Sequence, residues 1–335
     1  MKRKILQAGQ ATLAVSLPMP WAKKFNLKKG QELEVEEQGS SLKIKTTAMA
    51  EEDSATLNIS SLHPISTKII GMLYKAGYKK IKAIYTPNKK VIHRGKEVKE
   101  LDMIKNTFDH LIGMQLWELG KEKTSEPKRT GLAGELANEE ENYATVIESA
   151  KVNPKEFDNT FNKLYLHLIH QSEQIYEALS QNKDIFDEAY LAERLINQTA
   201  DFCTRILVSY GHEEHKKTLQ YYNLIDNLET IGDKYFYIAL EQHENKTKFD
   251  KSNLEFFEKA LRFIGESASV YRKFDFDKIK SLTKELDETI SAYEAKIKKS
   301  KGKENLISYN LYSIFLELYE MIEKLYFLNY DFFKD

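Results

Sequence analysis

Residues 1–46 read MKRKILQAGQATLAVSLPMPWAKKFNLKKGQELEVEEQGSSLKIKT, and apolar and polar side chains alternate in three short runs of this stretch. The runs are residues 12–17, 33–35 and 42–44, and their period of two is typical of β-strands with one buried face. A unit of this length, with no disulfide or evident metal site, is at or below the size that sustains its own core. We therefore expect residues 1–47 to form a small β unit that a second copy completes, as a homodimer.

Basic residues dominate the same stretch, because no acidic residue precedes Glu32 although the whole chain has a formal net charge of −1. Such a concentration of positive charge favours a polyanionic partner, with salt-dependent contacts to phosphates. The basic residues concerned are Lys2, Arg3, Lys4, Lys23, Lys24, Lys28 and Lys29.

Residues 9–18 (GQATLAVSLP), 21–22 (WA) and 27–35 (LKKGQELEV) resemble the swapped-hairpin domain of the AbrB/SpoVT/MazE type. The resemblance implies an interlocked dimer whose basic loops and strand edges bind DNA. The alternative is a hairpin used only for dimerisation, with its lysines solvated. The residues assigned to DNA binding are Lys2, Arg3, Lys4, Gln7, Gln10, Thr12, Lys23 and Lys24.

The length of 335 residues suits two or three domains, and charged residues of both signs are spread through the rest of the chain. Cys203 is the single cysteine, so no internal disulfide forms, as is usual in a reducing cytoplasm. Polar residues from Gln7 to Ser16 interrupt what would be the apolar part of a signal peptide. No apolar run approaches the roughly 20 residues that cross a bilayer. We expect a cytoplasmic protein without membrane insertion.

Residues 54–149 alternate between strand and helix patterns and predict a small α/β module. A helix opening at His63-Pro64 and a second one near 97–111 alternate with strands at 55–60, 80–85, 114–118 and 143–147. Residues 121–142 are charged and carry Pro127 and Gly131, which indicates a mobile insertion. No glycine-rich phosphate loop, nucleophile elbow or HExxH motif is present, so the module offers no catalytic signature.

From Asn153 onward the apolar period becomes that of amphipathic helices. Asn153 and Pro154 are typical of a helix N-cap and first position, and Gly211 of a helix end. The pattern predicts helices that start near 153, 186, 214, 251, 275 and 303. Equal lengths in the two halves indicate two three-helix repeats, 153–244 and 250–333. A continuous six-helix arrangement fits the same spacing.

Oxygen-bearing side chains gather on two of these helices. Asp226, Glu229 and Asp233 share one face at i, i+3 and i+7, and Asn197 and Asp201 form an i, i+4 pair on the preceding helix. Such a set can hold a hard cation. The alternative is a solvated acidic face, which is common in a chain this rich in carboxylates.

Residues 228–233 (LETIGD) resemble the Glu/Asp-x-x-x-Asp signature of PhoU proteins, and 197–201 (NQTAD) lies where the partner motif is expected. The resemblance implies two three-helix repeats, a metal site for iron, zinc or magnesium, and negative regulation of phosphate uptake. The order of domains is similar to archaeal fusions of an AbrB-type domain with a PhoU-type region. The metal ligands it implies are Asn197, Asp201, Asp226, Glu229 and Asp233.

Departures from that pattern limit the expected metal content. Asn197 stands where the family has a carboxylate. In the second repeat Glu320 aligns with Glu229, but Lys324 falls where Asp233 would be, and a lysine there repels a cation. We expect at most one metal cluster, in the first repeat.

The sequence thus predicts an α+β multidomain chain: a swapped-hairpin β domain, an α/β module and a PhoU-like pair of three-helix bundles. The function expected is that of a dimeric, non-enzymatic DNA-binding regulator of phosphate uptake. One alternative is an adaptor that docks on a phosphate transporter component or a sensor kinase. Another is a carboxylate-bridged metalloenzyme in the helices, but the inward Glu-x-x-His pairs it needs are not found.

Overall fold

The chain divides into two compact units, Met1–Ser54 and Ala55–Asp335, and each is described by itself. The computed structural model describes residues 2–38, 41–46, 53–93, 96–123, 128–130, 135–137, 140–246, 249–299 and 306–329.

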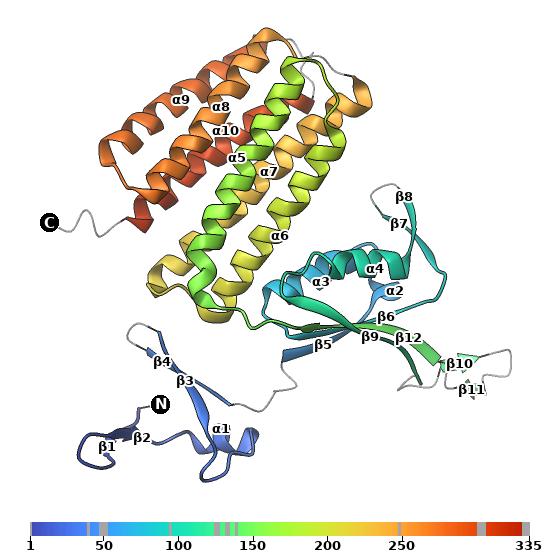
Figure 1. The fold of residues 1–335 in the computed structure, drawn as a ribbon, viewed down its shortest axis with the longest axis vertical. Coiled ribbons are helices and arrows are strands. Elements are labelled where there is room, and N and C mark those ends of the chain that lie inside the picture. Colours follow the sequence, from blue (N-terminus) through green and yellow to red (C-terminus); the bar gives the residue numbers. More distant parts are fainter. Residues whose placement is uncertain are drawn as a thin grey trace. The chain divides into compact units, whose positions relative to one another are not determined.

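The first unit consists of two antiparallel hairpins and a short helix, β1 (Ile5–Gln7), β2 (Leu13–Val15), α1 (Met19–Lys24), β3 (Leu33–Gln38) and β4 (Ser41–Thr46) (Figure 1). Proline occupies the first turn of α1, where its missing N–H is not needed. The three alternating runs of the sequence therefore lie in strands, as predicted, and Ile5–Gln7 adds a strand that pairs with the first of them.

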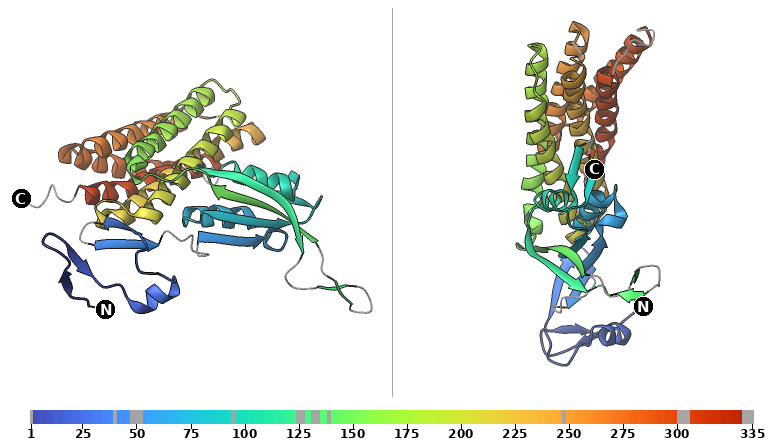
Figure 2. Two further views of the ribbon diagram at one scale, coloured as in Figure 1. Left: turned by 60° about the horizontal axis from the view of Figure 1, so that its bottom comes forward. Right: turned by 90° about the vertical axis from the view of Figure 1, so that its right-hand side faces the viewer.

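The second unit begins with a four-stranded sheet in the order β5-β6-β12-β9. Its strands are β5 (Ser54–Asn58), β6 (Lys80–Tyr85), β9 (Met114–Lys123) and β12 (Glu140–Glu148). One face carries the helices α2 (Ile59–Leu62), α3 (Ser66–Lys75) and α4 (Glu100–Phe108) (Figures 1 and 2). Ile81 and Val146 of the sheet are buried in one core with Ile70 and Ile104 of the helices. The predicted pairing of residues 143–147 with 114–118 is confirmed.

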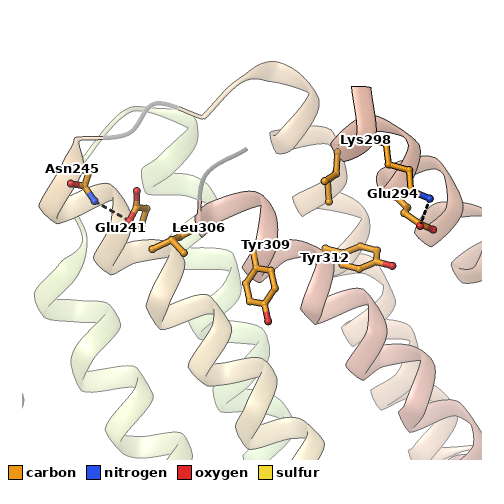
Figure 3. Close-up of a pocket in the computed structure, with 8 residues that line it drawn as sticks. Glu241, Asn245, Glu294, Lys298, Leu306, Tyr309 and Tyr312 are labelled. Atoms are coloured by element: carbon orange, nitrogen blue, oxygen red, sulfur yellow. Dashed lines mark hydrogen bonds and ion pairs between the residues drawn. The ribbon is translucent and has the colours of Figure 1, made fainter. Parts of the chain in front are cut away.

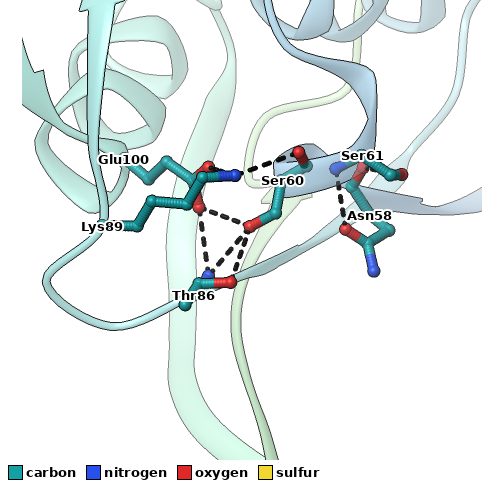
Figure 4. Close-up of polar contacts among 6 residues, drawn as sticks. All are labelled: Asn58, Ser60, Ser61, Thr86, Lys89 and Glu100. Carbon is teal, nitrogen blue, oxygen red and sulfur yellow. Dashed lines mark hydrogen bonds and ion pairs between the residues drawn. The ribbon is translucent and has the colours of Figure 1, made fainter.

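A hairpin that the sequence reading missed, β7 (Lys90–His93) and β8 (Lys96–Lys99), precedes α4. The helix expected near 97–111 therefore starts at Glu100. The Glu100 carboxylate is buried, accepts hydrogen bonds from Ser60 Oγ (2.6 Å) and Thr86 N (3.0 Å), and pairs with Lys89 Nζ at 3.0 Å (Figure 4). This network ties the start of α4 to α2 and to the end of β6.

Part of the stretch 121–142 lies in strands. Strand β9 continues to Lys123, β12 starts at Glu140, and between them β10 (Lys128–Thr130) pairs with β11 (Glu135–Ala137). Sequence reasoning missed these strands, because cross-strand backbone pairing tolerates charged, solvent-facing side chains, and the mobility of the insertion stays a prediction. Residues 124–127, 131–134 and 138–139 lie outside the described part.

In the described part of the chain after Asn153, six long helices follow, as predicted. They are α5 (Phe157–Ser180), α6 (Phe186–Tyr210), α7 (Thr218–Asn245), α8 (Lys251–Arg272), α9 (Phe276–Lys299) and α10 (Leu306–Leu328). Asn153 Oδ1 accepts a hydrogen bond from Lys155 N at 3.1 Å and caps a 3-10 turn before α5. Gly211 ends α6 at φ 77°, a conformation that favours glycine.

The helices pack as two groups of three, and α7 lies against α10 while α5 lies against α8 (Figures 1 and 2). One continuous apolar core runs through both groups, from Phe161 to Leu325. Asn227 of α7 donates a hydrogen bond to Glu317 of α10 at 2.6 Å, so polar contacts also join the repeats. Among the described helices, none is both long and apolar enough to cross a membrane.

Candidate functional site

The residues assigned to DNA binding all lie on the first unit, and all are exposed. Lys2, Arg3 and Lys4 lead directly into β1. Gln7, Gln10 and Thr12 belong to the β1–β2 hairpin, where Gln7 Nε2 donates to the Gln10 carbonyl at 3.4 Å. Lys23 and Lys24 form the last turn of α1, and Lys24 Nζ lies 5.1 Å from the ring centre of Phe25.

Apolar side chains of the same unit are also exposed. In the described part of this unit no side chain is fully buried, although its strands are rich in leucine, isoleucine and valine. The exposed fractions are 69% for Ile5, 56% for Leu6, 69% for Leu13, 47% for Val15, 56% for Val35 and 61% for Leu42. A single copy of the unit therefore leaves its hydrophobic strand residues in water.

The five predicted metal ligands lie on α6 and α7, which pack against each other. Asp226 is exposed, whereas Asn197, Asp201, Glu229 and Asp233 are half-buried. We call the surface formed by these five residues the carboxylate face.

Lys75, the last residue of α3, reaches the carboxylate face from the α/β module. Its Nζ lies 3.1 Å from Asp201 Oδ1. Burial raises the pKa of Asp201, and Lys75 only partly offsets this effect. Burial would lower the pKa of Lys75, but the carboxylates of Asp201 and Glu229 raise it above its usual value. Burial and the neighbouring Asp201 carboxylate raise the pKa of Glu229 to about 7, against the opposing effect of Lys75.

The donor set for a metal ion is incomplete in this arrangement. Asn197 Nδ2 donates to Glu193 at 2.9 Å, and Asn197 Oδ1 is buried with no hydrogen-bond partner in the described part of the chain. Among all the residues that the structure describes, no three side chains of His, Cys, Asp or Glu form a group that could hold a metal ion. The ammonium of Lys75 lies against Asp201 instead. Metal binding at Asn197, Asp201, Asp226, Glu229 and Asp233 stays a prediction from the resemblance.

The corresponding face of the second repeat carries a lysine of its own. Lys324 is buried on α10, and its Nζ donates to the carbonyl of Glu320 at 2.7 Å and to the carboxylate of Glu320 at 3.2 Å. A buried ammonium at this point disfavours a cation.

A buried arginine joins α6 to the α/β module close to Lys75. The Arg205 guanidinium donates to Glu148 at 2.8 Å and to the carbonyl of Tyr74 at 2.5 Å, and its Cζ lies 4.8 Å from the centre of the Tyr74 ring. Sequence reasoning missed this residue. The signal that could have found it is its position in the helix. Arg205 is a charged residue three positions after Phe202 and next to Ile206, on the inward stripe of α6.

A pocket of about 760 Å³ lies where the ends of α7 and α9 meet the start of α10 (Figure 3). Leu306, Tyr309 and Tyr312 give it an apolar wall, and Lys298 pairs with Glu294 at its rim. None of the predicted site residues lines this pocket.

Comparisons with known proteins cover the two ends of the chain differently. No curated protein matches it. It is similar to the crystal structure of the phosphate transport system regulatory protein PhoU from Streptococcus pneumoniae, with 16% identity and a TM-score of 0.43, over 52% of this chain and 94% of that chain. Residues 9–51 match the family described as antidote-toxin recognition MazE, bacterial antitoxin. This match confirms the resemblance drawn from residues 9–35.

Proposed function

We propose that this chain is a dimeric, DNA-binding transcriptional regulator of phosphate uptake. In this proposal the first unit binds DNA and the helical region senses the signal. The observation that carries it is the combination, on one small unit, of exposed apolar strands with an exposed set of basic side chains. The MazE-type match of residues 9–51 supports the same proposal.

The exposed strand residues support the proposed dimerisation. Removing a leucine, isoleucine or valine side chain from water contributes about 1.5–3 kcal/mol. Ile5, Leu13, Val15, Val35 and Leu42 offer that gain in each copy, because each is at least 47% exposed in one chain. A second copy of the same unit is the partner of matching shape and patterning, and a two-fold dimer doubles every such contact.

The positive charge of the first unit supports the proposed DNA binding. Lys2, Arg3, Lys4, Lys23 and Lys24 are exposed and present up to five cations per copy. Contacts with phosphates release counterions, so affinity for DNA falls steeply as salt rises. In a dimer two such sets would contact two half-sites, and a ligand bound to the helical region would change their spacing.

The phosphate part of the proposal rests on the motifs at residues 228–233 and 197–201. Negative regulation predicts that cells lacking this protein take up more phosphate than cells that have it when phosphate is plentiful. Uptake of radiolabelled phosphate, with the gene restored as a control, measures this. Equal uptake in both strains would contradict the phosphate assignment and leave DNA binding open to its own test.

The test of DNA binding starts with DNA fragments that the full chain selects from a random pool. The affinity of the chain for these fragments is then measured between about 50 and 200 mM salt. Over this range a protein that makes several phosphate contacts loses roughly 10³–10⁵ in affinity. The variant Lys2→Glu/Arg3→Glu/Lys4→Glu should lose binding. The matched control, Lys155→Glu/Lys163→Glu/Lys183→Glu, reverses three exposed charges of the helical region and should bind as the natural chain does. Absent or salt-independent binding would contradict the proposal and favour the adaptor alternative.

A further inference from the structure

The carboxylate face already has a cation, supplied by another part of the same chain. Lys75 of α3 lies 3.1 Å from Asp201 of α6, and the two side chains are 34% and 24% exposed. The Asp201 carboxylate raises the pKa of Glu229 of α7, and the Glu229 carboxylate raises the pKa of Lys75. One ammonium and two carboxylates from three helices thus share a partly solvated site.

The second repeat shows the same solution with local residues. Lys324 occupies the position in the second repeat that corresponds to Asp233 in the first. Its ammonium donates a hydrogen bond to the carboxylate of Glu320, one helical turn earlier. Both repeats therefore place a lysine ammonium against an acidic residue of the face. In the second repeat the lysine belongs to the face itself, whereas in the first it arrives from the α/β module.

We propose that Lys75 takes the place of a metal ion at the carboxylate face of the first repeat, and that its ion pair with Asp201 latches the α/β module to α6. An ion bound to Asp201 and the ammonium of Lys75 would compete for the same carboxylate. The latch and the metal prediction therefore exclude each other at Asp201. Asp201 provides a negative charge that compensates the lysine, and the lysine holds the end of α3.

A second contact shows why this pair can act as a latch. The Arg205–Glu148 pair of the same joint has side chains only 2% and 15% exposed and is shielded from solutes. The Lys75–Asp201 pair is open to solvent on one side and is screened more readily. The buried pair is suited to permanent attachment, and the exposed pair is the part of the joint that a charged ligand can reach.

The α/β module that carries the latch follows the first unit in the sequence. Strand β5 begins at Ser54, where the first unit ends, and the α/β module that starts there carries Lys75. A ligand that withdraws Asp201 from Lys75 would loosen α3 on the bundle. The proposed latch goes beyond the proposed function. It depends neither on the identity of the ligand nor on DNA binding.

The test compares the natural full chain with Lys75→Met, with Asp201→Asn and with the charge swap Lys75→Asp/Asp201→Lys. Metal content is measured after dialysis against Zn²⁺, Fe²⁺ or Mg²⁺ and removal of free ion. Hydrogen exchange is followed in the peptide that contains residues 66–76. Lys68→Met removes an exposed lysine from the same helix and serves as the control. Lys75→Arg keeps the positive charge. It therefore separates an effect of the lost charge in Lys75→Met from a loss of folding.

We expect natural chain and Asp201→Asn to retain the same, substoichiometric metal. Exchange in residues 66–76 should rise by about two- to fivefold in Lys75→Met, stay unchanged in Lys68→Met and Lys75→Arg, and return toward the natural rate in the charge swap. About one ion per natural chain that Asp201→Asn loses would overturn the proposal. Unchanged exchange in Lys75→Met, or a charge swap that exchanges as fast as Lys75→Met, would overturn it as well.

Discussion

Arg205 of α6 and Glu148 of β12 form a buried ion pair, with Nη2 and Oε1 2.8 Å apart. This pair joins the helical region to the α/β module. Removing one partner leaves the other charge buried and uncompensated, which costs about 3–5 kcal/mol. Arg205→Met should therefore lower the free energy of unfolding by about that amount.

The control for Arg205 is Arg262, which pairs with Glu266 and Glu285 on the exposed surface. Exposed ion pairs contribute only about 0–1 kcal/mol. Denaturant unfolding of Arg205→Met and Arg262→Met measures the difference. Equal losses for the two variants would contradict the buried role of Arg205.

Glu100 gives a second prediction within the α/β module. Its buried carboxylate accepts from Ser60 Oγ and Thr86 N and pairs with Lys89. Glu100→Gln keeps the size but removes the charge, and should cost about 1–3 kcal/mol. Glu97→Gln is the control, because Glu97 pairs with Lys90 in an exposed position, and should change stability by less than about 1 kcal/mol. Urea unfolding measures the free energy of unfolding of both variants. If Glu100→Gln leaves this free energy unchanged, the hydrogen-bond network around Glu100 contributes nothing to stability.

Asp184 predicts a dependence of stability on acid. Burial would raise its pKa, but hydrogen bonds from Phe186 N, His243 and Lys246 outweigh this and lower the pKa to about 2. The folded pKa is below the unfolded value of about 3.9. The contribution is therefore complete above pH 4 and is lost as pH falls toward 2. The difference in unfolding free energy between the natural chain and Asp184→Asn should shrink over this range, and a constant difference would contradict the assignment.

Leu13 predicts how the first unit associates. Leu13→Asp removes an apolar side chain that is 69% exposed in one chain. Each dimer would lose the burial of two leucines, which contributes about 1.5–3 kcal/mol for each leucine. The dissociation constant of the dimer should therefore rise at least about a hundredfold. Met72→Asp, at a position 64% exposed on α3, should leave association unchanged. Sedimentation velocity over a dilution series distinguishes the two, and an unchanged Leu13→Asp dimer would place the interface elsewhere.

Much of the fold could be predicted because its signals are local. The period of two found the strands at Leu13–Val15, Leu33–Gln38 and Ser41–Thr46, and the helical period found the six long helices of the described residues. Local signals failed where pairing across strands decides the structure. The β7–β8 hairpin is short and charged, and the extension of β9 and β12 uses residues of low strand preference.

The candidate sites were predictable to different degrees. The exposed basic residues of the first unit follow from composition, and helical spacing places Asp226, Glu229 and Asp233 on one face. The pairing of Asp201 with Lys75 could not be predicted, because the residues are far apart in sequence and belong to different parts of the second unit. Only the tertiary packing of α3 on α6 brings them together.

The molar mass of the full chain in solution tests the central claim most directly, because the proposed function requires a second copy both for DNA recognition and for the folding of the first unit. At micromolar concentration, sedimentation equilibrium should give twice the chain mass of 39.0 kDa. Hydrogen exchange measured on the same sample should show β1 to β4 protected. A mass of 39.0 kDa with those strands protected would contradict the account.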